Sequence, residues 1–519
     1  MKKLHYLLGA FVVTIAIISA TSCSDSEKEN PTPVDIQKNL LITALKSNPE
    51  LSLFTETFQT LDLSASQAAG LTVFALTNTA LAETPLTEEV LRRHILEAAY
   101  KPSELSELQT VTSLGGAELV VKTTEGMVAL NNTEIGLQQA VGNSILYTLD
   151  KAIPSYNTYL GLEPQYAVKT YQVQRLRPEC IDLDDATFEW EQTFNGSTAI
   201  VSTQADYDFI TMEAGEYVLT LTATKPSGEV HEFVKTTTLT VTDPEEKYNP
   251  FASRIVDFLP APGQYTNGYG SAGSSTKYTS KQNALNRILP DMEVGKANVY
   301  LGTFGGYMVV GFDHTIVNKP GYCDFTTKYG GNNVGPAIIW VAFDANGNGQ
   351  PDENEWYEIK GSEYGTENDL GMHTYTYQTK PEKAKTIVWS REDGESGELA
   401  VYQFEVPCWI TGDTYSLSGR LLKTNLSAGS MPAQLPYAWG YAGNQKNDSA
   451  AAAIDIDWAV DAEGNSVHLP GVDFVKVVCA ISASRSAMMG EVRYQVMSIE
   501  DLHLQEIAFT PQEAQGKTE

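Results

Sequence analysis

The stretch that decides the fold of the largest part of the chain is AIIWVAF-DANGNGQPDENE-WYEI, residues 337–359. Two apolar runs flank a polar loop that contains glycines and many oxygen-bearing side chains. Strand-like runs joined by a loop with Asn-Gly steps predict a β-hairpin. The loop itself has two interpretations, because it fits either a solvated hairpin tip or a bound cation.

The spacing of the loop's oxygens favours the cation. An EF-hand-type calcium loop takes ligands from positions 1, 3, 5, 7, 9 and 12, and it has glycine at position 6. Counted from Asp344, position 6 is Gly349 and position 12 is Glu355, the expected bidentate carboxylate. Strands flank the loop and no nucleophile adjoins it, so we expect a structural Ca²⁺ that pins the hairpin. The predicted ligands are Asp344, Asn346, Asn348, Gln350 (through its carbonyl), Asp352 and Glu355.

The N-terminal residues predict an exported, lipid-anchored protein. A positive start and an apolar run from Leu7 to Ile18, too short to span a bilayer, are typical of a signal peptide over residues 1–22. Small residues directly before Cys23 resemble a bacterial lipobox, so we expect lipidation of Cys23. The alternative is an ordinary signal peptide with a chance cysteine. The acidic tether 23–34 resembles that of Bacteroidota-type lipoproteins, which implies the outer membrane and its exterior face.

The composition is strongly acidic. The formal net charge of −30 disfavours nucleic acid as a partner, because phosphate backbones are repelled. Cations, neutral ligands or another protein remain compatible with such a surface. The other cysteines lack CxxC spacing, so zinc is not expected and any disulfide pairing stays open. They are Cys180, Cys323, Cys408 and Cys479.

The chain after the tether predicts a mainly β, multidomain protein. Its first segment, residues 35–154, mixes helical and strand patterns, with a helix expected over 91–96. The blocks TVFALTN (72–78), LRRHIL (91–96) and NSILYTLDKAIP (143–154) resemble an α+β fasciclin domain. That resemblance implies adhesion or scaffolding. For His94 we expect a structural role inside the fold.

The second segment, residues 165–243, predicts strands. Residues 215–224 alternate apolar and polar, and an earlier run ends in Trp190, which we expect to be buried. The segment resembles a PKD-like immunoglobulin-type sandwich, although the WDFGDG signature of that family is absent. Such modules usually serve as spacers.

The third segment, residues 250–510, predicts a large antiparallel β-sandwich, of which a jelly roll is one form. It lacks HExxH, GxSxG, phosphate-loop and dinucleotide motifs, so we expect no enzyme. Asp455 and Asp457 are expected to alternate on one strand face, where hydrogen bonding is favoured over acid–base chemistry. Strand-like runs occupy residues 299–302, 306–313, 337–343, 356–360 and 474–480.

Three aromatic residues, Tyr437, Trp439 and Tyr441, stand at alternate positions in a Gly-containing segment. Rings on one face would form a flat platform for a sugar or a planar ligand. A core strand explains the same spacing equally well, and the sequence leaves both interpretations open.

Several blocks of the third segment together resemble surface lipoproteins that accompany TonB-dependent uptake systems, notably those for cobalamin. The blocks are LPAPGQY (259–265), GTFGGYMVVGFDHTIVNKPG (302–321), WYEIKGSEYG (356–365), YAWGYAGN (437–444) and IDIDWAVDAEGNSVHLPGVDFVKV (454–477). One departure is Gly443, where the resemblance implies aspartate.

The resemblance implies capture of a small-molecule ligand, with cobalamin first, and transfer to an outer-membrane transporter. Tyr437, Trp439 and Tyr441 are the candidate ligand contacts. Two alternatives stay open: an adhesin that binds glycan or matrix protein, and, less favoured, a glycan-active enzyme.

Overall fold

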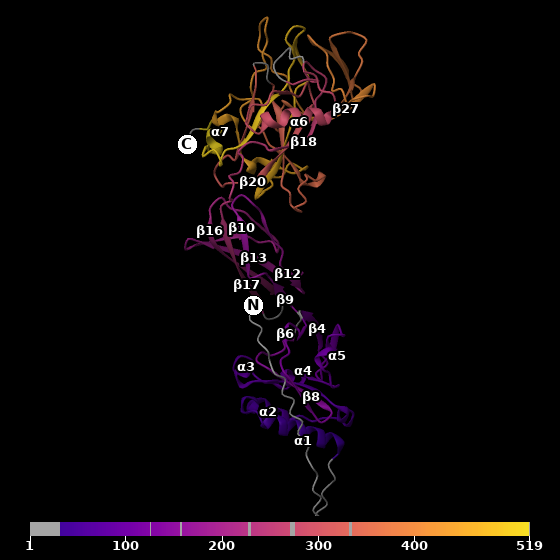
Figure 1. The fold of residues 1–519 in the computed structure, drawn as a ribbon, viewed down its shortest axis with the longest axis vertical. Coiled ribbons are helices and arrows are strands. Elements are labelled where there is room, and N and C mark those ends of the chain that lie inside the picture. Colours follow the sequence, from indigo (N-terminus) through magenta and orange to yellow (C-terminus); the bar gives the residue numbers. More distant parts are fainter. Residues whose placement is uncertain are drawn as a thin grey trace, which may run out of the picture. The chain divides into compact units, whose positions relative to one another are not determined.

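A computed structural model of the chain describes residues 32–124, 126–155, 158–226, 230–269, 276–331 and 335–517. Cys23, the signal peptide and most of the tether lie outside these residues. Figure 1 shows the chain as separate sheets, with 40% of residues in strands and 15% in helices, which confirms the mainly β, multidomain prediction. Within the described residues, no helix has the length and apolar character needed to cross a membrane.

The chain divides into two compact units. Of the described residues, those from 32 to 159 form one unit together with 180–184, and those at 160–179 and from 185 to 517 form the other. The short strands β9 (Tyr159–Gly161) and β12 (Glu179–Ile181) fall near these boundaries. Each unit has its own buried apolar core.

The first unit is built on a four-stranded sheet in the order β2-β1-β8-β7. Every residue of β1 is buried and β1 pairs in parallel with β8, as expected for a strand covered on both faces. The strands are β1 (Thr72–Leu76), β2 (Ile95–Leu96), β7 (Gln138–Val141) and β8 (Ser144–Leu149), and a second sheet holds β3 (Thr110–Thr112), β4 (Glu118–Thr124), β5 (Met127–Leu130) and β6 (Thr133–Glu134). The helices are α1 (Pro33–Lys46), α2 (Ser52–Thr60), α3 (Asn78–Glu83), α4 (Glu88–Arg93) and α5 (Pro102–Leu105).

The prediction of a helix over residues 91–96 is wrong for its last residues. Helix α4 ends at Arg93, and Ile95 and Leu96 form strand β2 opposite Val73 and Thr72. Pairing with the buried strand β1 outweighs helical propensity at these two apolar residues.

The second unit begins with a five-stranded sheet in the order β10-β17-β16-β13-β14. Its β10–β17 pair is parallel and its other pairs are antiparallel. Trp190 is fully buried, and its Nε1 donates to the carbonyl of Ala205 at 3.1 Å. The strands are β10 (Gln165–Lys169), β13 (Thr187–Phe194), β14 (Ser197–Ser202), β16 (Gly215–Pro226) and β17 (Val230–Thr242), with the separate pair β11 (Gln174–Leu176) and β15 (Tyr207–Phe209).

The C-terminal β-domain contains a six-stranded antiparallel sheet in the order β18-β20-β30-β22-β23-β29. The strands are β18 (Arg254–Leu259), β20 (Tyr307–Val317), β22 (Ala337–Ala342), β23 (Trp356–Ile359), β29 (Ala459–Val460) and β30 (Gly471–Cys479). A four-stranded sheet packs on it through one apolar core and contains β19 (Val299–Tyr300), β21 (Phe325–Tyr329), β28 (Ala453–Ile454) and β33 (Gln495–Asp501). This packing is the sandwich that the strand pattern predicts.

Smaller elements complete this domain. A third sheet holds β24 (Asp369–Gln378), β25 (Thr386–Arg391), β26 (Ser396–Ala400) and β27 (Thr414–Leu422), and a short pair joins β31 (Ser484–Ser486) to β32 (Gly490–Glu491). The helices are α6 (Lys281–Met292) and α7 (Pro511–Ala514). Helix α6 was not expected from the sequence; its Ala284, Ile288 and Met292 enter the sandwich core.

His94 has the structural role that we expect. The backbone N–H of Ile153 donates to its Nε2 at 2.8 Å, so Nδ1 carries the proton and donates to the carbonyl of Val90 at 2.7 Å. Burial lowers the pKa of His94 to about 4. The ring is therefore neutral at neutral pH and ties helix α4 to the chain after β8.

Acid should destabilise the first unit through His94. Because its pKa is about 4 when folded and 6.5 otherwise, the unfolded state binds the proton first. The stability that neutral His94 contributes is fully present above pH 6.5 and is lost as the pH falls towards 4. Hydrogen exchange of β1 and β8 should report about 2 kcal/mol less opening free energy at pH 5 than at pH 7.5. His94→Asn should flatten this pH dependence, and an unchanged profile in that variant would contradict the assignment.

Candidate functional site

The predicted calcium loop joins strands β22 and β23, which pair as an antiparallel hairpin. Gly347 and Gly349 adopt φ of 72° and 74°, the left-handed region that glycine enters without steric cost. The two glycines let the loop fold back on itself, so that its polar side chains converge.

Asp344 and Asp352 are the centres of this convergence. The carboxylate of Asp344 accepts from the N–H groups of Asn348 at 3.0 Å and Gly349 at 2.9 Å. One oxygen of Asp352 accepts from the side-chain amides of Asn346 at 2.5 Å and Asn348 at 2.9 Å. Four of the six predicted ligands therefore lie within one hydrogen-bonded cluster.

Glu355 closes the cluster. Its carboxylate is buried and accepts from the N–H groups of Ala345 at 3.0 Å and Asp352 at 2.9 Å. Gln350 is exposed and donates its N–H to Asn348 Oδ1 at 2.7 Å. The arrangement brings hard oxygen donors together in the register that calcium requires.

One rearrangement separates this loop from a cation site. The amides of Asn346 and Asn348 direct nitrogen towards Asp352, whereas a cation needs their oxygens there. Turning them would break these two hydrogen bonds and also the two that their oxygens accept from the N–H groups of Asn348 and Gln350, each worth about 1 kcal/mol. Within the described ranges, no group of three or more His, Cys, Asp or Glu side chains is arranged to hold a metal ion. The donors fit calcium in type and order, and binding requires the two amides to turn.

Asp473 of β30 anchors the loop to the sheet. Its carboxylate accepts from the N–H of Asp344 at 2.7 Å and from the hydroxyl of Thr315 at 2.5 Å. Burial raises the pKa of Asp473, and these hydrogen bonds oppose that shift. One carboxylate thus fixes the start of the loop against two neighbouring strands.

Two arginines hold the outer side of the loop. Arg175 Nε donates to the carbonyl of Ala345 at 2.9 Å, and its guanidinium also contacts the carbonyl of Asp344. Arg254 donates to the carbonyl of Gly349 at 2.9 Å. A cavity of about 300 Å³ adjoins these groups. Cationic side chains therefore satisfy the loop's carbonyls while its carboxylates face inward.

The aromatic triplet does not form one exposed platform. Tyr437 and Tyr441 are 6% and 3% exposed and belong to a core cluster, and the N–H of Glu363 donates to the Tyr441 hydroxyl at 3.0 Å. Trp439 is half-buried against Trp458, with ring centroids 4.6 Å apart. The prediction of a flat shared face is wrong because the segment is not a regular strand. The core interpretation describes both tyrosines, and a ligand contact for Trp439 stays a prediction.

Asp455 and Asp457 do not alternate on a strand face. They lie in a turn between β28 and β29, where Asp455 accepts from the N–H of Asp457 at 2.9 Å. Burial raises the pKa of Asp455 to about 7. Asp457 accepts from Asn318 at 2.8 Å and has His468 Nδ1 at 2.9 Å. Both carboxylates have the hydrogen bonds that the sequence interpretation favoured.

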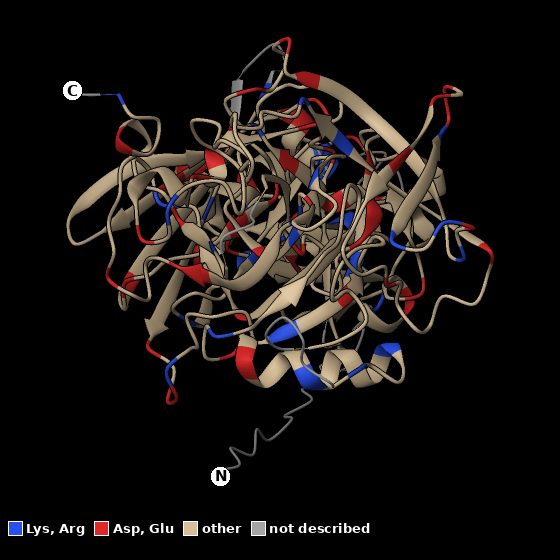
Figure 2. Ribbon diagram, turned by 90° about the horizontal axis from the view of Figure 1, so that it is seen from above, with Lys and Arg blue, Asp and Glu red and all other residues tan. Residues whose placement is uncertain are grey.

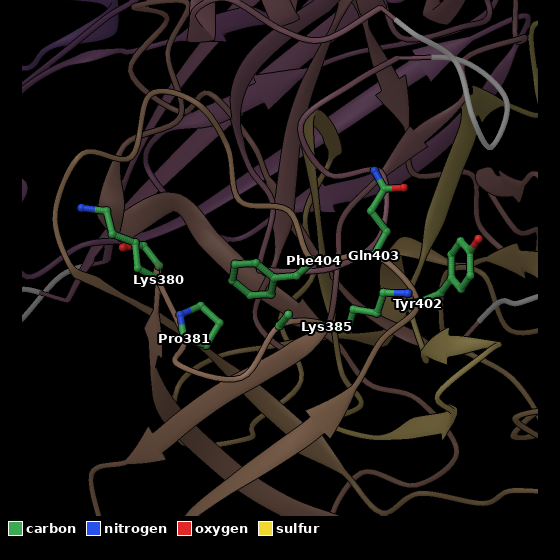
Figure 3. Close-up of a pocket in the computed structure, with 8 residues that line it drawn as sticks. Lys380, Pro381, Lys385, Tyr402, Gln403 and Phe404 are labelled. Atoms are coloured by element: carbon green, nitrogen blue, oxygen red, sulfur yellow. The ribbon is translucent and has the colours of Figure 1, made fainter.

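A pocket beside the third sheet was not expected from the sequence. Figure 3 shows Phe404 between Lys380 and Pro381 on one side and Tyr402 on the other. The pocket holds about 550 Å³. Its walls come from the β24–β25 loop and from the segment after β26, so that only tertiary structure brings them together. The lining residues are Thr379, Lys380, Pro381, Ala384, Lys385, Tyr402, Gln403 and Phe404.

Comparison with known proteins identifies one domain. Residues 49–154 match the fasciclin domain family, so the first unit contains a fasciclin domain, a class that is generally non-catalytic and adhesive. No curated protein matches the chain.

Two solved structures show weak likeness to the chain. One is murine CRIg, at 12% identity over 17% of this chain and 98% of that one, with a TM-score of 0.14. The other is a quinonprotein alcohol dehydrogenase-like protein from Bacteroides thetaiotaomicron, at 11% identity over 47% of this chain and 51% of that one, also with a TM-score of 0.14. At these scores neither structure bears on the fold or the function.

Replacing the anchor of the loop should destabilise the C-terminal β-domain. Asp473→Ala would leave the donors of Asp344 and Thr315 without their acceptor, at a cost of about 2–4 kcal/mol in the free energy of unfolding. Urea unfolding followed by tryptophan fluorescence measures this, since every tryptophan lies after residue 185. The control is Glu353→Ala, an exposed carboxylate of the same loop, which should change stability by less than about 0.5 kcal/mol. If the two variants unfolded at the same urea concentration, Asp473 would not anchor the loop.

Proposed function

We propose that the protein is a lipid-anchored surface protein whose C-terminal β-domain captures a small-molecule ligand for a TonB-dependent outer-membrane transporter. Cobalamin is the first ligand to test. One observation supports this reading most. Three of the sequence blocks that carry the resemblance, residues 302–321, 356–365 and 454–477, supply strands β20, β23, β29 and β30 of the same six-stranded sheet. The shared pattern thus describes one structural unit.

The proposal includes no catalysis. The fasciclin domain belongs to a class that generally lacks it. The carboxylates considered above for acid–base chemistry, Asp455 and Asp457, are engaged in hydrogen bonds to the backbone, Asn318 and His468. We therefore assign the chain to binding proteins.

The anchor in this proposal is a lipid on Cys23, and the protein faces the cell exterior. The lipid is then the only contact with the membrane, and the acidic surface disfavours nucleic acid as a partner. Metabolic labelling with a fatty acid should mark the wild-type protein and not Cys23→Ser. Protease added to intact cells should remove the wild-type protein. Equal labelling of both forms would rule out this anchor.

We also propose that the loop from Asp344 to Glu355 binds structural calcium. Binding would relieve repulsion among its carboxylates, and saturation at a hundredfold excess over Kd should stabilise the domain by about 2.7 kcal/mol. Calorimetry should detect calcium binding by the wild type and not by the Asp344→Ala, Glu355→Gln double variant.

The matched control for calcium is Asp461→Ala. Asp461 organises a similar polar turn, where it accepts from the N–H groups of Glu463 at 3.0 Å and Asn465 at 2.8 Å. This variant should bind calcium as the wild type does. Identical titrations of the wild type and the double variant would eliminate the proposed site.

The ligand proposal is tested by titrating cyanocobalamin into the chain without residues 1–23. We expect saturable binding, because a capture protein must hold its ligand before transfer. Trp439→Ala should weaken binding if this half-exposed ring contacts the ligand, while Tyr402→Ala controls for an exposed aromatic residue elsewhere. Absence of binding at tens of micromolar would refute cobalamin capture.

A second candidate function is adhesion, which the fasciclin match favours. Immobilised matrix proteins and glycans would then retain the mature chain in the absence of cobalamin. Deletion of the fasciclin domain should abolish that retention and leave ligand capture intact. For the truncated protein, adhesion therefore predicts that retention is lost, whereas capture predicts that cobalamin still binds.

A further inference from the structure

The pocket beside the third sheet has rigid walls. Thr379 donates its hydroxyl proton to the carbonyl of Gly412 at 2.8 Å, which fixes the start of the β24–β25 loop. The N–H of Val401 donates to the carbonyl of Lys385 at 2.9 Å and joins the end of that loop to the opposite wall. One side-chain and one backbone hydrogen bond thus hold the two walls in place.

The aromatic side of the pocket is suited to a sugar ring. Tyr402 is 53% exposed, so much of its ring is accessible to a ligand. Phe404 packs on the core cluster that contains Tyr377 and Phe304, so its position is fixed from behind. Exposed and supported rings stack on the apolar face of a sugar while their polar edges stay in water.

The charge of the lining is opposite to that of the whole chain. Figure 2 shows acidic positions spread over many loops, yet no Asp or Glu is among the residues that line this pocket. Lys380 and Lys385 line it, and Lys380 faces only the highly exposed Asp413 at 3.4 Å, a weak pair. The nearby carboxylate of Glu405 is paired with Lys277 outside the lining. Two ammonium groups therefore remain for a ligand.

Lys385 is held in a costly conformation. Its φ of 63° is in the left-handed region, which is sterically unfavourable for a residue with a β-carbon. Its ammonium lies over the ring of Tyr402, 4.8 Å from the centroid. Strain of this kind persists where the surrounding structure maintains it, and here it brings a cation and an exposed ring together at the pocket.

We infer that this pocket binds an anionic carbohydrate, meaning a sugar ring that carries a sulfate or a carboxylate. The ring would stack on Tyr402, and Lys380 and Lys385 would hold the anionic group. Lysine suits this purpose because its compact ammonium donates hydrogen bonds in several directions. The pocket lies open to solvent, so that a polysaccharide chain can pass through it. This inference is independent of the cobalamin proposal.

The test uses the mature chain, residues 24–519, in EDTA so that the calcium loop cannot contribute. Three hexasaccharides of equal length serve as calorimetric probes: a chondroitin sulfate, a galacturonate and a neutral maltohexaose. We expect saturable binding of at least one anionic probe, weakened by salt, and none of the neutral one. Because chondroitin sulfate carries carboxylates as well as sulfates, binding of both anionic probes assigns recognition to the carboxylate, and binding of chondroitin sulfate alone assigns it to the sulfate. No anionic binding at millimolar concentration, or equal binding of the neutral probe, overturns the inference.

The decisive variant is Lys385→Gly. Glycine favours the left-handed backbone, so the variant should fold with an equal or higher thermal midpoint and yet bind the anionic probe at least about tenfold more weakly. Lys383→Ala is the matched control: it removes the same charge from the same loop, but Lys383 pairs with Glu398 at 2.8 Å and does not line the pocket. Its affinity should stay within about twofold of wild type. Equal losses in the two variants would mean general charge attraction and would reject the site.

Discussion

The C-terminal β-domain depends on one buried strand, β30, which lies between β20 and β22. Its Val472, Val475 and Val477 are fully buried, and a strand covered on both faces tolerates a polar side chain only when it is hydrogen-bonded. Asp473 meets this condition by accepting from Thr315 and Asp344, which belong to or follow the two neighbouring strands. The buried carboxylate of Asp473 therefore also fixes the start of the loop that follows β22.

Arginine and lysine side chains of the C-terminal β-domain and the adjoining segment contact buried carboxylates, loop carbonyls or an open pocket. Arg420 lies between the buried carboxylates of Glu358 and Asp369, at 2.6 Å and 2.9 Å. Arg175 and Arg254 bind loop carbonyls, and Lys380 and Lys385 line an open pocket. Arg420 offsets the cost of removing the two buried carboxylates from water. The lysines of the pocket differ from these arginines, because they line a cavity that is open to solvent and ligands.

Much of the fold was predictable because local patterns and tertiary structure agree. The apolar runs on either side of residues 344–355 form a hairpin, and the glycine at 349 has the φ that the loop register requires. The sequence misled where spacing alone was used. Tyr437 and Tyr441 alternate without forming a strand, and Asp455 begins a turn. Periodicity identifies a face only inside a regular element.

Two further features were not predicted. Helix α6 carries a local signal, since Ala284, Ile288 and Met292 recur at helical spacing after the N-cap Ser280, but its other residues are largely polar and its surroundings are rich in strands. The pocket of Lys385 and Tyr402 joins segments that carry no motif. Its strained lysine depends on a hydrogen bond from Val401 to its carbonyl. Such sites arise from the packing of distant segments, which a single sequence does not specify.

The parallel pairing of β10 with β17 has a mechanical consequence. These are the strands by which the chain enters and leaves the five-stranded sheet, and they pair over five residues from Gln165 opposite Thr238 to Lys169 opposite Thr242. Because they run in the same direction, tension on the chain pulls them along their length in opposite senses. Their hydrogen bonds then share the load and must fail together, whereas an antiparallel hairpin would unzip one bond at a time. A module built in this way resists shear between whatever holds its two ends.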